Sequence, residues 1–262
     1  MKVALLISTY NWPEALSLVL KSVTHQNLFP DEILIADDGS TEETANVIRK
    51  YSEKINLPIQ HVWQKDEGFR KAVILNKTIA KSNADYVIQI DGDCVMHKNF
   101  IRDHLKNSRS GVYLFGSRVN IQENYLTTMF SKQKIDYKWF SKGISKRTRS
   151  IYLPYLSGFY KEKNQLSGKL RGCNFSFWKQ DFLDINGYNE DITGWGKEDS
   201  ELAVRLLNSG VKAKRLRYAG IIYHIWHQEK SREKRILNEG IQNTAIDKKL
   251  IRCSNGVDQY LK

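Results

Sequence analysis

The segment Asp85-Tyr-Val-Ile-Gln-Ile-Asp-Gly-Asp-Cys94 decides the fold that we expect, because an apolar run ends there in two carboxylates separated by one glycine. A buried strand through this run delivers Asp91 and Asp93 to the carboxyl edge of a sheet, where open α/β folds bind their ligands. Side chains two apart in an extended segment point the same way, and Gly92 lets the backbone come close to a ligand. The segment therefore predicts either a site for a divalent cation, Mn²⁺ or Mg²⁺, or an ordinary Asp-Gly turn after a strand.

The residues before this strand alternate between strand and helix patterns. Apolar runs predict buried strands at residues 3–7 and 32–36, and a helical pattern follows each of them. We expect Asn11 to cap the first helix, and Ser40 with Glu43 to form a capping box at the start of the second. This order predicts an α/β fold with a mostly parallel, Rossmann-like central sheet flanked by helices.

Polar side chains follow the ends of these first two strands. Thr9, Tyr10 and Asn11 come after the first strand, and Asp37 and Asp38 come after the second. Parallel strands that are neighbours bring such ends together. Asp38 could accept a hydrogen bond from the ring N–H of a uracil while Tyr10 lies against the base. The alternative is that both aspartates only support the turn and the helix cap, which we favour for Asp37.

Two cations begin the next helical pattern. Arg70 and Lys71 follow a predicted strand at residues 59–63, and Asn76 lies within the helix. Positive charge gains nothing from the dipole at the start of a helix, which favours anions. A bound diphosphate or a solvated helix face would each explain these cations.

Together, these motifs resemble the nucleotide-binding half of inverting family 2 glycosyltransferases with the GT-A fold. The resemblance implies that the first elements bind the uridine of a nucleotide sugar. It also implies that the two carboxylates of the DxD motif hold the diphosphate through a divalent metal. The likeness covers residues 1 to about 105 and rests on Thr9-Tyr-Asn11, the strand end at Asp38, Arg70 ahead of Asn76, and Asp91-Gly92-Asp93.

A glycine-rich loop precedes a helix pattern in the second half of the chain. Gly194 and Gly196 permit a tight bend that can approach a sugar, and Trp195 offers a flat face for a pyranose ring. The helix pattern begins at Glu198, and Asp199 falls on its inward stripe. Acidic residues at a helix start can also be simple caps. We favour a functional role, because Asp199 faces inward and capping does not explain the glycine-tryptophan loop before it.

This loop resembles the Gly-Trp-Gly-x-Glu-Asp signature of the galactosyltransferase and chondroitin-polymerase type of GT-A enzyme. The resemblance implies that Trp195 packs on the acceptor sugar and that Asp199 is the catalytic base, with Glu198 beside it in the catalytic centre. Lys197 departs from the signature, since many members have glycine there, and this departure could narrow the acceptor site.

A histidine after this motif completes the metal shell in the resembling family. His224 is therefore our first choice as the metal ligand beside Asp91 and Asp93, and His227 is the second. Mn²⁺ accepts mixed nitrogen and oxygen ligands. An offset of three residues on one strand sends side chains to opposite faces, so we expect only one of the two histidines to bind.

Residues 131–149 combine many cations with the aromatic residues Tyr137, Trp139 and Phe140. Such a segment can rest on an anionic lipid leaflet, with the aromatics at the headgroups. A flexible acceptor loop and a solvated helix are the alternatives. We favour contact with a membrane or a lipid-linked acceptor, because exposed aromatics are otherwise costly.

The composition indicates a globular protein with anionic partners. The 262 residues include 41% hydrophobic residues and carry a formal net charge of +12, which suits nucleotide phosphates, an acidic leaflet or nucleic acid. The three cysteines are scattered, which is typical of a reducing compartment. No apolar run reaches 18 residues and no signal-peptide pattern occurs, so we expect a cytoplasmic protein, with at most peripheral contact with the inner membrane leaflet.

We therefore expect a metal-dependent inverting glycosyltransferase. It would move a hexose or N-acetylhexosamine from a UDP-sugar to a hydroxyl of a glycan, or of a lipid-linked glycan, in bacterial-type polysaccharide or lipopolysaccharide synthesis. Residues 1–110 would form the nucleotide-sugar-binding half, and residues 111–262 the acceptor-binding and catalytic-base half of the same GT-A domain. The alternatives are a nucleotidyltransferase that makes nucleotide sugars, for which the loop after the first strand lacks a glycine-rich lysine motif, and a basic nucleic-acid-binding protein, for which no recognition element is evident.

Overall fold

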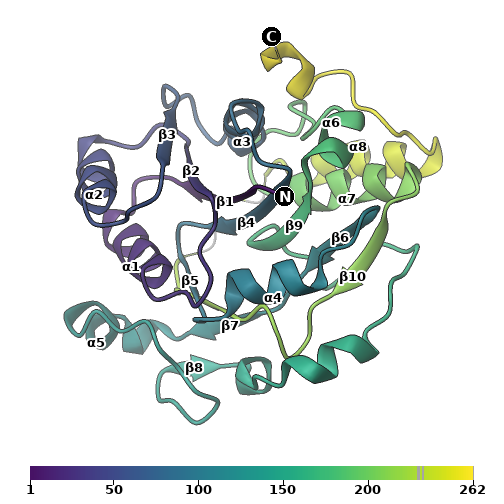
Figure 1. Cartoon of the computed structure of the whole chain (residues 1–262). Helices are drawn as coiled ribbons and strands as arrows, with labels where there is room; N and C mark the ends of the chain where they lie inside the picture. Colours follow the sequence, from purple (N-terminus) through teal and green to yellow (C-terminus); the bar gives the residue numbers. More distant parts are fainter. Residues whose placement is uncertain (229–230, 232, 262) are drawn as a thin grey trace.

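The centre of the molecule is a seven-stranded sheet with the strand order β10-β6-β9-β4-β1-β2-β3 (Figure 1). Its pairings are parallel except those of β9, which runs antiparallel to both β4 and β6. This computed structural model describes residues 1–228, 231 and 233–261, and it confirms the expected α/β fold. The strands are β1 (Val3–Thr9), β2 (Glu32–Asp37), β3 (Ile59–Trp63), β4 (Tyr86–Asp91), β6 (Val112–Phe115), β9 (Asn174–Trp178) and β10 (Lys212–Arg215).

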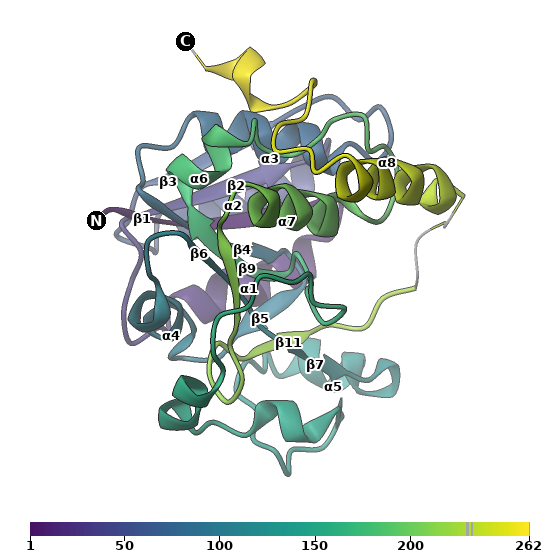
Figure 2. The same ribbon diagram turned by 90° about the vertical axis from the view of Figure 1, so that its right-hand side faces the viewer.

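Helices cover both faces of this sheet (Figure 2). Side chains alternate along β1, so that Leu5 and Ile7 pack with α1, α2 and α4, whereas Ala4 and Leu6 pack with α3, α6 and α7. A strand buried on both faces reads as a continuous apolar run, which explains the composition of β1. The helices are α1 (Pro13–Val23), α2 (Glu42–Ser52), α3 (Lys71–Ala80), α4 (Phe100–Asn107), α6 (Lys179–Asp184) and α7 (Glu198–Asn208).

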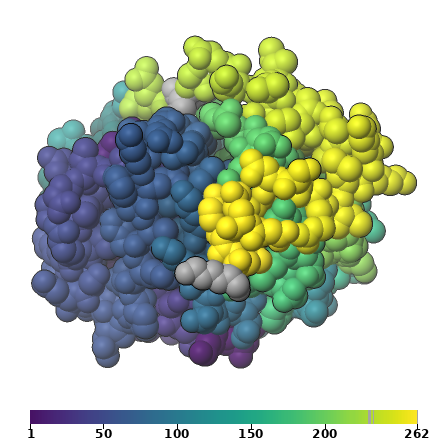
Figure 3. Space-filling model, turned by 90° about the horizontal axis from the view of Figure 1, so that it is seen from above, coloured from purple at the N-terminus to yellow at the C-terminus, as the bar shows by residue number. Residues whose placement is uncertain are grey.

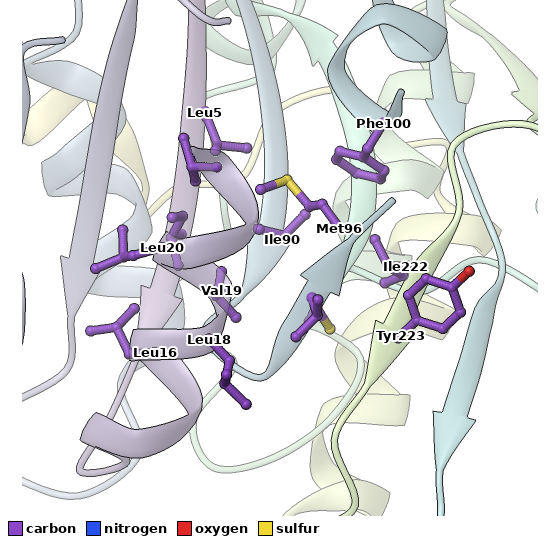
Figure 4. Packing of buried hydrophobic residues seen from close by; sticks show 14 of the residues in the cluster. Leu5, Leu16, Leu18, Val19, Leu20, Ile90, Met96, Phe100, Ile222 and Tyr223 are labelled. Atoms are coloured by element: carbon purple, nitrogen blue, oxygen red, sulfur yellow. The ribbon is translucent and has the colours of Figure 1, made fainter. Parts of the chain in front are cut away.

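A second sheet of four short strands, in the order β5-β11-β7-β8, extends one side of the core. Met96 of β5 and Ile222 and Tyr223 of β11 belong to the same buried cluster as the leucines of α1 (Figure 4). Because β5 directly follows the two carboxylates, its pairing with β11 fixes what lies beside them. The strands are β5 (Cys94–Met96), β7 (Arg118–Ile121), β8 (Ile144–Ser145) and β11 (Ile222–His224).

The remaining elements are short helices and the carboxyl-terminal tail. Residues 123–160 form the lower end of the molecule in both ribbon views (Figures 1 and 2). The sequence predicts a mostly helical tail from Glu229, a residue that lies outside the described part of the chain. Among the described residues, no helix is both long enough and apolar enough to cross a bilayer. The elements are η1 (Glu123–Tyr125), α5 (Leu126–Ser131), η2 (Arg147–Ser150), η3 (Pro154–Phe159), α8 (Arg235–Asp247) and η4 (Val257–Tyr260).

The amino-terminal and carboxyl-terminal parts of the chain share the central sheet. Strands β6, β9 and β10 follow residue 110, and β9 lies between β4 and β6. Seen from above, the purple and blue residues and the green and yellow residues lie side by side in one continuous body (Figure 3). The proposed division at residue 110 therefore separates two sides of one sheet.

The two predicted helix caps are wrong, because the side chains concerned join two loops instead. The backbone N–H of Asn11 donates to Oγ of Ser40 at 2.9 Å, and the N–H of Thr41 donates to Oδ1 of Asn11 at 2.8 Å. The N-cap positions fall on Trp12 and Thr41, and neither makes a side-chain cap bond. The pattern predicted caps one residue too early, and the result is a link between the loops that follow β1 and β2.

The sequence also predicts an ion pair between Glu201 and Arg205 on the outer face of α7. The pair forms at 2.7 Å, but both side chains are buried. Arg205 also donates to the carbonyl oxygens of Ile185 and Gly187, at 2.6 and 2.7 Å. A buried cation needs this complete set of partners, and the set holds α7 against the turn that follows α6.

Candidate active site

A cavity of about 870 Å³ opens where β1, β2 and β4 end, at the carboxyl edge of the sheet. A smaller hollow of about 300 Å³ adjoins it and is lined by Gly194. The start of α7 also lines the large cavity. Of the residues singled out in the sequence, Thr9, Tyr10, Asn11, Asp38, Asp91, Gly92, Asp93, Trp195, Gly196, Glu198, Asp199 and His227 line the large cavity.

The carboxylate of Asp38 is held rigidly at the end of β2. It accepts hydrogen bonds from Nε2 of Gln64 at 2.7 Å and from the backbone N–H of Arg70 at 2.9 Å. Tyr10 lies at the mouth and donates its hydroxyl to Asp66 at 2.9 Å. Asp37, by contrast, accepts from the N–H of Ser40 at 2.8 Å and supports the turn, as we expected.

Lys71 reaches the first carboxylate of the Asp-Gly-Asp turn. Its ammonium lies 2.6 Å from Oδ1 of Asp91, and the hydroxyl of Ser8 donates to the same oxygen at 2.8 Å. Burial alone would raise the pKa of Asp91, but the charge and the hydrogen bond of Lys71 hold that pKa below its usual value. Asp91 therefore faces the cavity as an ionised carboxylate that already has a cation.

The second carboxylate lies in a group that could hold a metal ion. One ligand atom from each of Asp93, His224 and His227 lies within 4.8 Å of the others. Nε2 of His224 is 3.5 Å, and Nε2 of His227 is 3.3 Å, from Oδ2 of Asp93. Burial lowers the pKa of His224, which favours the neutral imidazole that binds metals. One carboxylate and two imidazoles suit Mn²⁺ better than Mg²⁺, which prefers oxygen.

The expectation that only one histidine faces this site is wrong. His224 is the last residue of β11 and is paired with Cys94, next to Asp93. The chain leaves the strand after His224, so the alternation of a strand no longer applies to His227. The backbone N–H of Ile225 donates to the carbonyl oxygen of Asp93 at 2.9 Å and holds this exit beside the turn.

Glu198 and Asp199 lie in the first turn of α7 and line the same cavity as the strand ends. Burial is the main cause that raises the pKa of Glu198 to about 7, and the neighbouring charge of Asp199 raises it further. Oε2 of Glu198 is buried and has no hydrogen-bond partner in the described part of the chain. Burial also raises the pKa of Asp199, whose Oδ2 accepts the backbone N–H of Gly172 at 2.6 Å.

The backbone explains two positions of the motifs. Lys197 has φ 79°, in the left-handed region that favours glycine, and its ammonium pairs with Glu239 of α8 at 3.0 Å. Glycine is favoured at position 92 because the backbone there lies close to β1. An added Cβ would lie 3.0 Å from Oγ1 of Thr9 and 3.1 Å from the carbonyl oxygen of Ser8. Gly92 thus packs closely against the end of β1.

Two residues that we expected to bind the nucleotide sugar do not line the cavity. Asn76 is fully buried, where its amide donates to the carbonyl of Tyr188 and to Glu190, both at 2.8 Å, and accepts the N–H of Tyr188 at 2.9 Å. The guanidinium of Arg70 pairs with Glu67 at 2.8 Å. Asn76 is a structural residue, and Arg70 contributes to the site through its backbone N–H.

Sequence reasoning assigned no role to Arg118, Arg171 and Arg235, three cations that line the cavity. It left Lys71 between a diphosphate contact and a solvated helix face. Only the unfavourable position of Lys71 at a helix start gave a signal. Arg118 and Arg171 become neighbours of the site through strand pairing, which local patterns do not reveal.

The basic segment at residues 131–149 divides into buried and exposed aromatics. Tyr137 is buried against Tyr223, with ring centroids 5.0 Å apart, so it is a core residue. Trp139 and Phe140 remain 59% and 62% exposed. The expectation of exposed aromatics therefore holds for two of the three.

Residues 4–173 match glycosyl transferase family 2. The chain belongs to this family. Residues 158–228 also match the N-terminal domain of galactosyltransferase, a stretch that contains the Glu198-Asp199 turn and the two histidines of the candidate metal group. The family 2 protein is an enzyme of the glycosyltransferase class, as the sequence predicts.

The relatives of this family 2 protein are larger. It is 23% identical over 240 residues to chondroitin synthase from Pasteurella multocida, covering 84% of this chain and 24% of that protein. It is 25% identical over 232 residues to validoxylamine A glucosyltransferase from Streptomyces hygroscopicus, covering 79% of this chain and 48% of that protein. The chain thus spans between a quarter and a half of these two relatives.

Solved structures share its fold at low identity. The structure of TarS from S. aureus matches 99% of this chain and 41% of that chain, with a TM-score of 0.64 and 16% identity. The mannosyltransferase PcManGT from Pyrobaculum calidifontis, in complex with GDP-Man and Mn²⁺, matches 85% of this chain and 56% of that chain, with a TM-score of 0.59 and 16% identity. The expected GT-A fold is confirmed.

Proposed function

We propose that this enzyme is a metal-dependent, inverting glycosyltransferase. It transfers a hexose or N-acetylhexosamine from a UDP-sugar to a glycan hydroxyl in polysaccharide or lipopolysaccharide synthesis. The observation that carries the proposal is that the Asp-Gly-Asp turn, His227 and the two acids of α7 line one cavity, with His224 beside Asp93. TarS, a structural relative, has been solved in complex with UDP-GlcNAc, and PcManGT with GDP-Man and Mn²⁺.

In this proposal the strand ends bind the donor. Asp38 accepts a hydrogen bond from the uracil, and Tyr10, Thr9 and Asn11 line its pocket. Asp93, His224 and His227 would hold the cation, which supplies charge to stabilise the diphosphate that leaves. Asp91, which the sequence predicts as a metal ligand, is paired with Lys71 and lies outside this group, so the Lys71 ammonium offsets the repulsion between Asp91 and the diphosphate.

The acids of α7 act on the acceptor side. The acceptor oxygen forms its bond to the anomeric carbon while the bond between that carbon and the diphosphate oxygen breaks, and the acceptor proton passes to the carboxylate of Asp199. Glu198, which lines the cavity and has a buried oxygen without a hydrogen-bond partner among the described residues, is assigned to hold a sugar hydroxyl. Trp195 and Gly196 are assigned to the acceptor sugar, with Gly194 in the adjoining hollow.

We test this function by release of UDP from a panel of UDP-sugars with Mn²⁺, Mg²⁺ or EDTA. Turnover of at least one donor is expected with Mn²⁺, lower turnover with Mg²⁺, and none with EDTA. The stereochemistry of the product at the anomeric carbon is read by NMR. Turnover that survives EDTA would contradict the metal assignment, and retention of configuration would contradict the inverting mechanism.

We also propose peripheral contact with an anionic leaflet on the cytoplasmic side, through the lower end of the molecule. Trp139 and Phe140 are exposed there, as are Tyr155 and Phe159, which are 72% and 79% exposed. Aromatic rings beside cations suit the headgroup region of a bilayer. The Trp139→Ser/Phe140→Ser variant should sediment less with phosphatidylglycerol vesicles, whereas Ile236→Ser/Leu237→Ser, which removes exposed apolar side chains from α8, should sediment like the wild type. Equal sedimentation of both variants and the wild type would contradict this contact.

A further inference from the structure

Six cations converge near the ends of β6 and β10, and we call them the cation cluster. Their shared feature is that none lies within 4 Å of a carboxylate in residues 1–228, 231 and 233–261, although other cations on this protein form such pairs. They come from four separate stretches of chain. The cation cluster consists of Arg118, Lys146, Arg149, Arg171, Arg215 and Arg217.

The topology of the sheet brings these cations together. Strands β6 and β10 are parallel neighbours, so the residues that follow them emerge at the same edge. Nη2 of Arg215, at the end of β10, donates to Oγ of Ser117 at 3.0 Å, and the next residue after Ser117 is Arg118. Nη1 of Arg149 donates to the carbonyl oxygen of Arg118 at 3.1 Å. The carboxyl edge of parallel strands is also where α/β folds bind ligands.

Three members of the cation cluster, Lys146, Arg149 and Arg215, are electrostatically unfavourable without an anion. Partial burial is the first cause that lowers the pKa of Arg149, and the guanidinium groups of Arg171 and Arg217 lower it further. Partial burial and then Arg149 also lower the pKa of Lys146. Nε of Arg215 is buried and has no acceptor within the described residues. Repulsion of this kind is costly in the free protein and is relieved when an anion binds.

The cation cluster is continuous with the active-site cavity on its acceptor side. Arg118 and Arg171 line the cavity as well as belonging to the cluster. Arg171 is close enough to Asp199 to lower its pKa, although burial raises that pKa overall. An acceptor whose sugar lies at Asp199 is therefore close to the cluster, whereas the donor site at Asp38 and Asp91 lies at the ends of β2 and β4.

We infer that the cation cluster binds the diphosphate of an acceptor whose sugar is linked through diphosphate to a lipid carrier. This inference rests on the proposed function and names its acceptor class. Several guanidinium groups from separate segments suit a group with several charged oxygens, whereas one carboxylate would satisfy a single guanidinium fork. The lipid is favoured because Lys146 and Arg149 lie on the same stretch, residues 139–159, as the exposed aromatics Trp139 and Phe159.

The test compares three probes that share an octyl tail: N-acetylglucosamine linked to octanol through diphosphate, octyl N-acetylglucosaminide, and octyl glucuronide. Their dissociation constants are measured by calorimetry below the micelle concentration, with UDP and Mn²⁺ present so that the donor site is filled. The variant is Arg149→Gln/Arg217→Gln, because neither residue lines the cavity. The control is Lys50→Gln/Lys248→Gln, which removes the same charge from exposed positions on α2 and after α8. The single variant Lys146→Gln, at an exposed position, serves as a second probe of the cluster if the double variant does not fold.

The diphosphate probe is expected to bind at least tenfold more tightly than the other two, and the Arg149→Gln/Arg217→Gln variant to weaken it at least tenfold. Lys146→Gln is expected to weaken it about threefold, and the control to leave it unchanged. Equal affinity for the three probes, tighter binding of the glucuronide, or equal weakening in the control would overturn the inference. Thermal stabilisation by UDP and Mn²⁺, measured on the same samples, reports the donor site separately, so its loss would instead count against the proposed function.

Discussion

The ammonium nitrogen of Lys71 lies 2.6 Å from Oδ1 of Asp91, at the point where β4 ends in the cavity. The first carboxylate of the Asp-Gly-Asp turn is thus paired within the protein, while the second faces two histidines. The two aspartates, which look equivalent in the sequence, therefore have different partners and different proposed tasks.

Lys71→Gln leaves the Asp91 carboxylate with Ser8 as its remaining side-chain donor. Because the pair is partly exposed, we expect the free energy of unfolding to fall by about 1–3 kcal/mol at pH 7.5, which is less than for a fully buried pair. Lys71 holds the folded pKa of Asp91 below its ordinary value of 3.8, so this stabilisation is present above that pH and disappears as the pH falls through the folded value. Urea unfolding at pH 7.5, 5 and 3.5 measures the difference. Lys81→Gln, an exposed lysine after the same helix, is the control, and equal stability of the two variants at pH 7.5 would be the contrary result.

Glu198→Gln is expected to stabilise the protein at pH 8. The pKa of Glu198 rises from 4.5 to about 7 on folding, chiefly through burial, so the folded state holds this proton more tightly than the unfolded chain. Stability from this group is therefore present below pH 4.5 and is lost as the pH rises to about 7. We expect the Tm of the variant to exceed that of the wild type by about 2–6 °C at pH 8 and to match it at pH 4. Calorimetry across this pH range measures the Tm, and Glu43→Gln in the first turn of α2 is the control. A Tm difference between Glu198→Gln and the wild type that is no larger at pH 8 than at pH 4 would refute the assignment.

Asp199→Asn should abolish most turnover while the enzyme still binds the donor. Removal of a general base commonly costs ~10²–10⁴ in rate, and Asn keeps the shape of the side chain. Initial rates of UDP release with saturating donor and acceptor measure this, and UDP binding with Mn²⁺ is expected to remain within twofold of the wild type. Asp247→Asn, at the exposed end of α8, should be fully active. Near-normal turnover of Asp199→Asn would transfer the role of base to Glu198.

His224→Ala and His227→Ala are each expected to weaken Mn²⁺ binding at least tenfold, since each imidazole faces Asp93 within 3.5 Å. Titration of Mn²⁺ in the presence of UDP, followed by electron paramagnetic resonance, measures the affinity. His25→Ala, an exposed histidine after α1, should bind Mn²⁺ normally. An unchanged affinity in His227→Ala would leave His224 as the single histidine ligand.

Gly92→Ala is expected to destabilise the protein by about 1 kcal/mol and to weaken Mn²⁺ binding, because the added methyl would meet Thr9 and the Ser8 carbonyl at 3.0–3.1 Å. The loop after β1 or the Asp-Gly-Asp turn must then shift by a few tenths of an ångström. Gly158→Ala serves as the control, since its Cβ would meet nothing within 4 Å. Chemical unfolding and Mn²⁺ titration measure the stability and the Mn²⁺ affinity of both variants. Equal values for Gly92→Ala and Gly158→Ala would show that the contact between Gly92 and β1 is unimportant.

The sequence predicted the first half of the fold well because the information there is local. Continuous apolar runs mark buried parallel strands, and the ends of β1, β2 and β4 carry the polar residues that meet in the cavity. Strands β7, β8 and β10 escaped prediction because they are short and owe their conformation to their neighbours. Strand β9 carries Asn174 and Ser176, which form buried hydrogen bonds with His104, so its pattern does not read as an apolar core strand.

The site was predictable where the motif itself provides the side chain. Asp38, Asp91, Asp93, Glu198 and Asp199 all line the cavity. The assignments failed where the partner depends on distant packing. Asn76 binds the Tyr188 backbone, which lies 112 residues away in the sequence, and the position of His227 depends on where β11 ends.

The position of β9 between β4 and β6 affects how the chain can fold during synthesis. Until residues 174–178 leave the ribosome, β4 has β1 on one side and an open, apolar edge on the other. A nascent chain that ends near residue 110 thus exposes the kind of edge on which chains aggregate. The edge of β4 is therefore expected to stay open while roughly 70 further residues are translated, at about 5–20 residues per second.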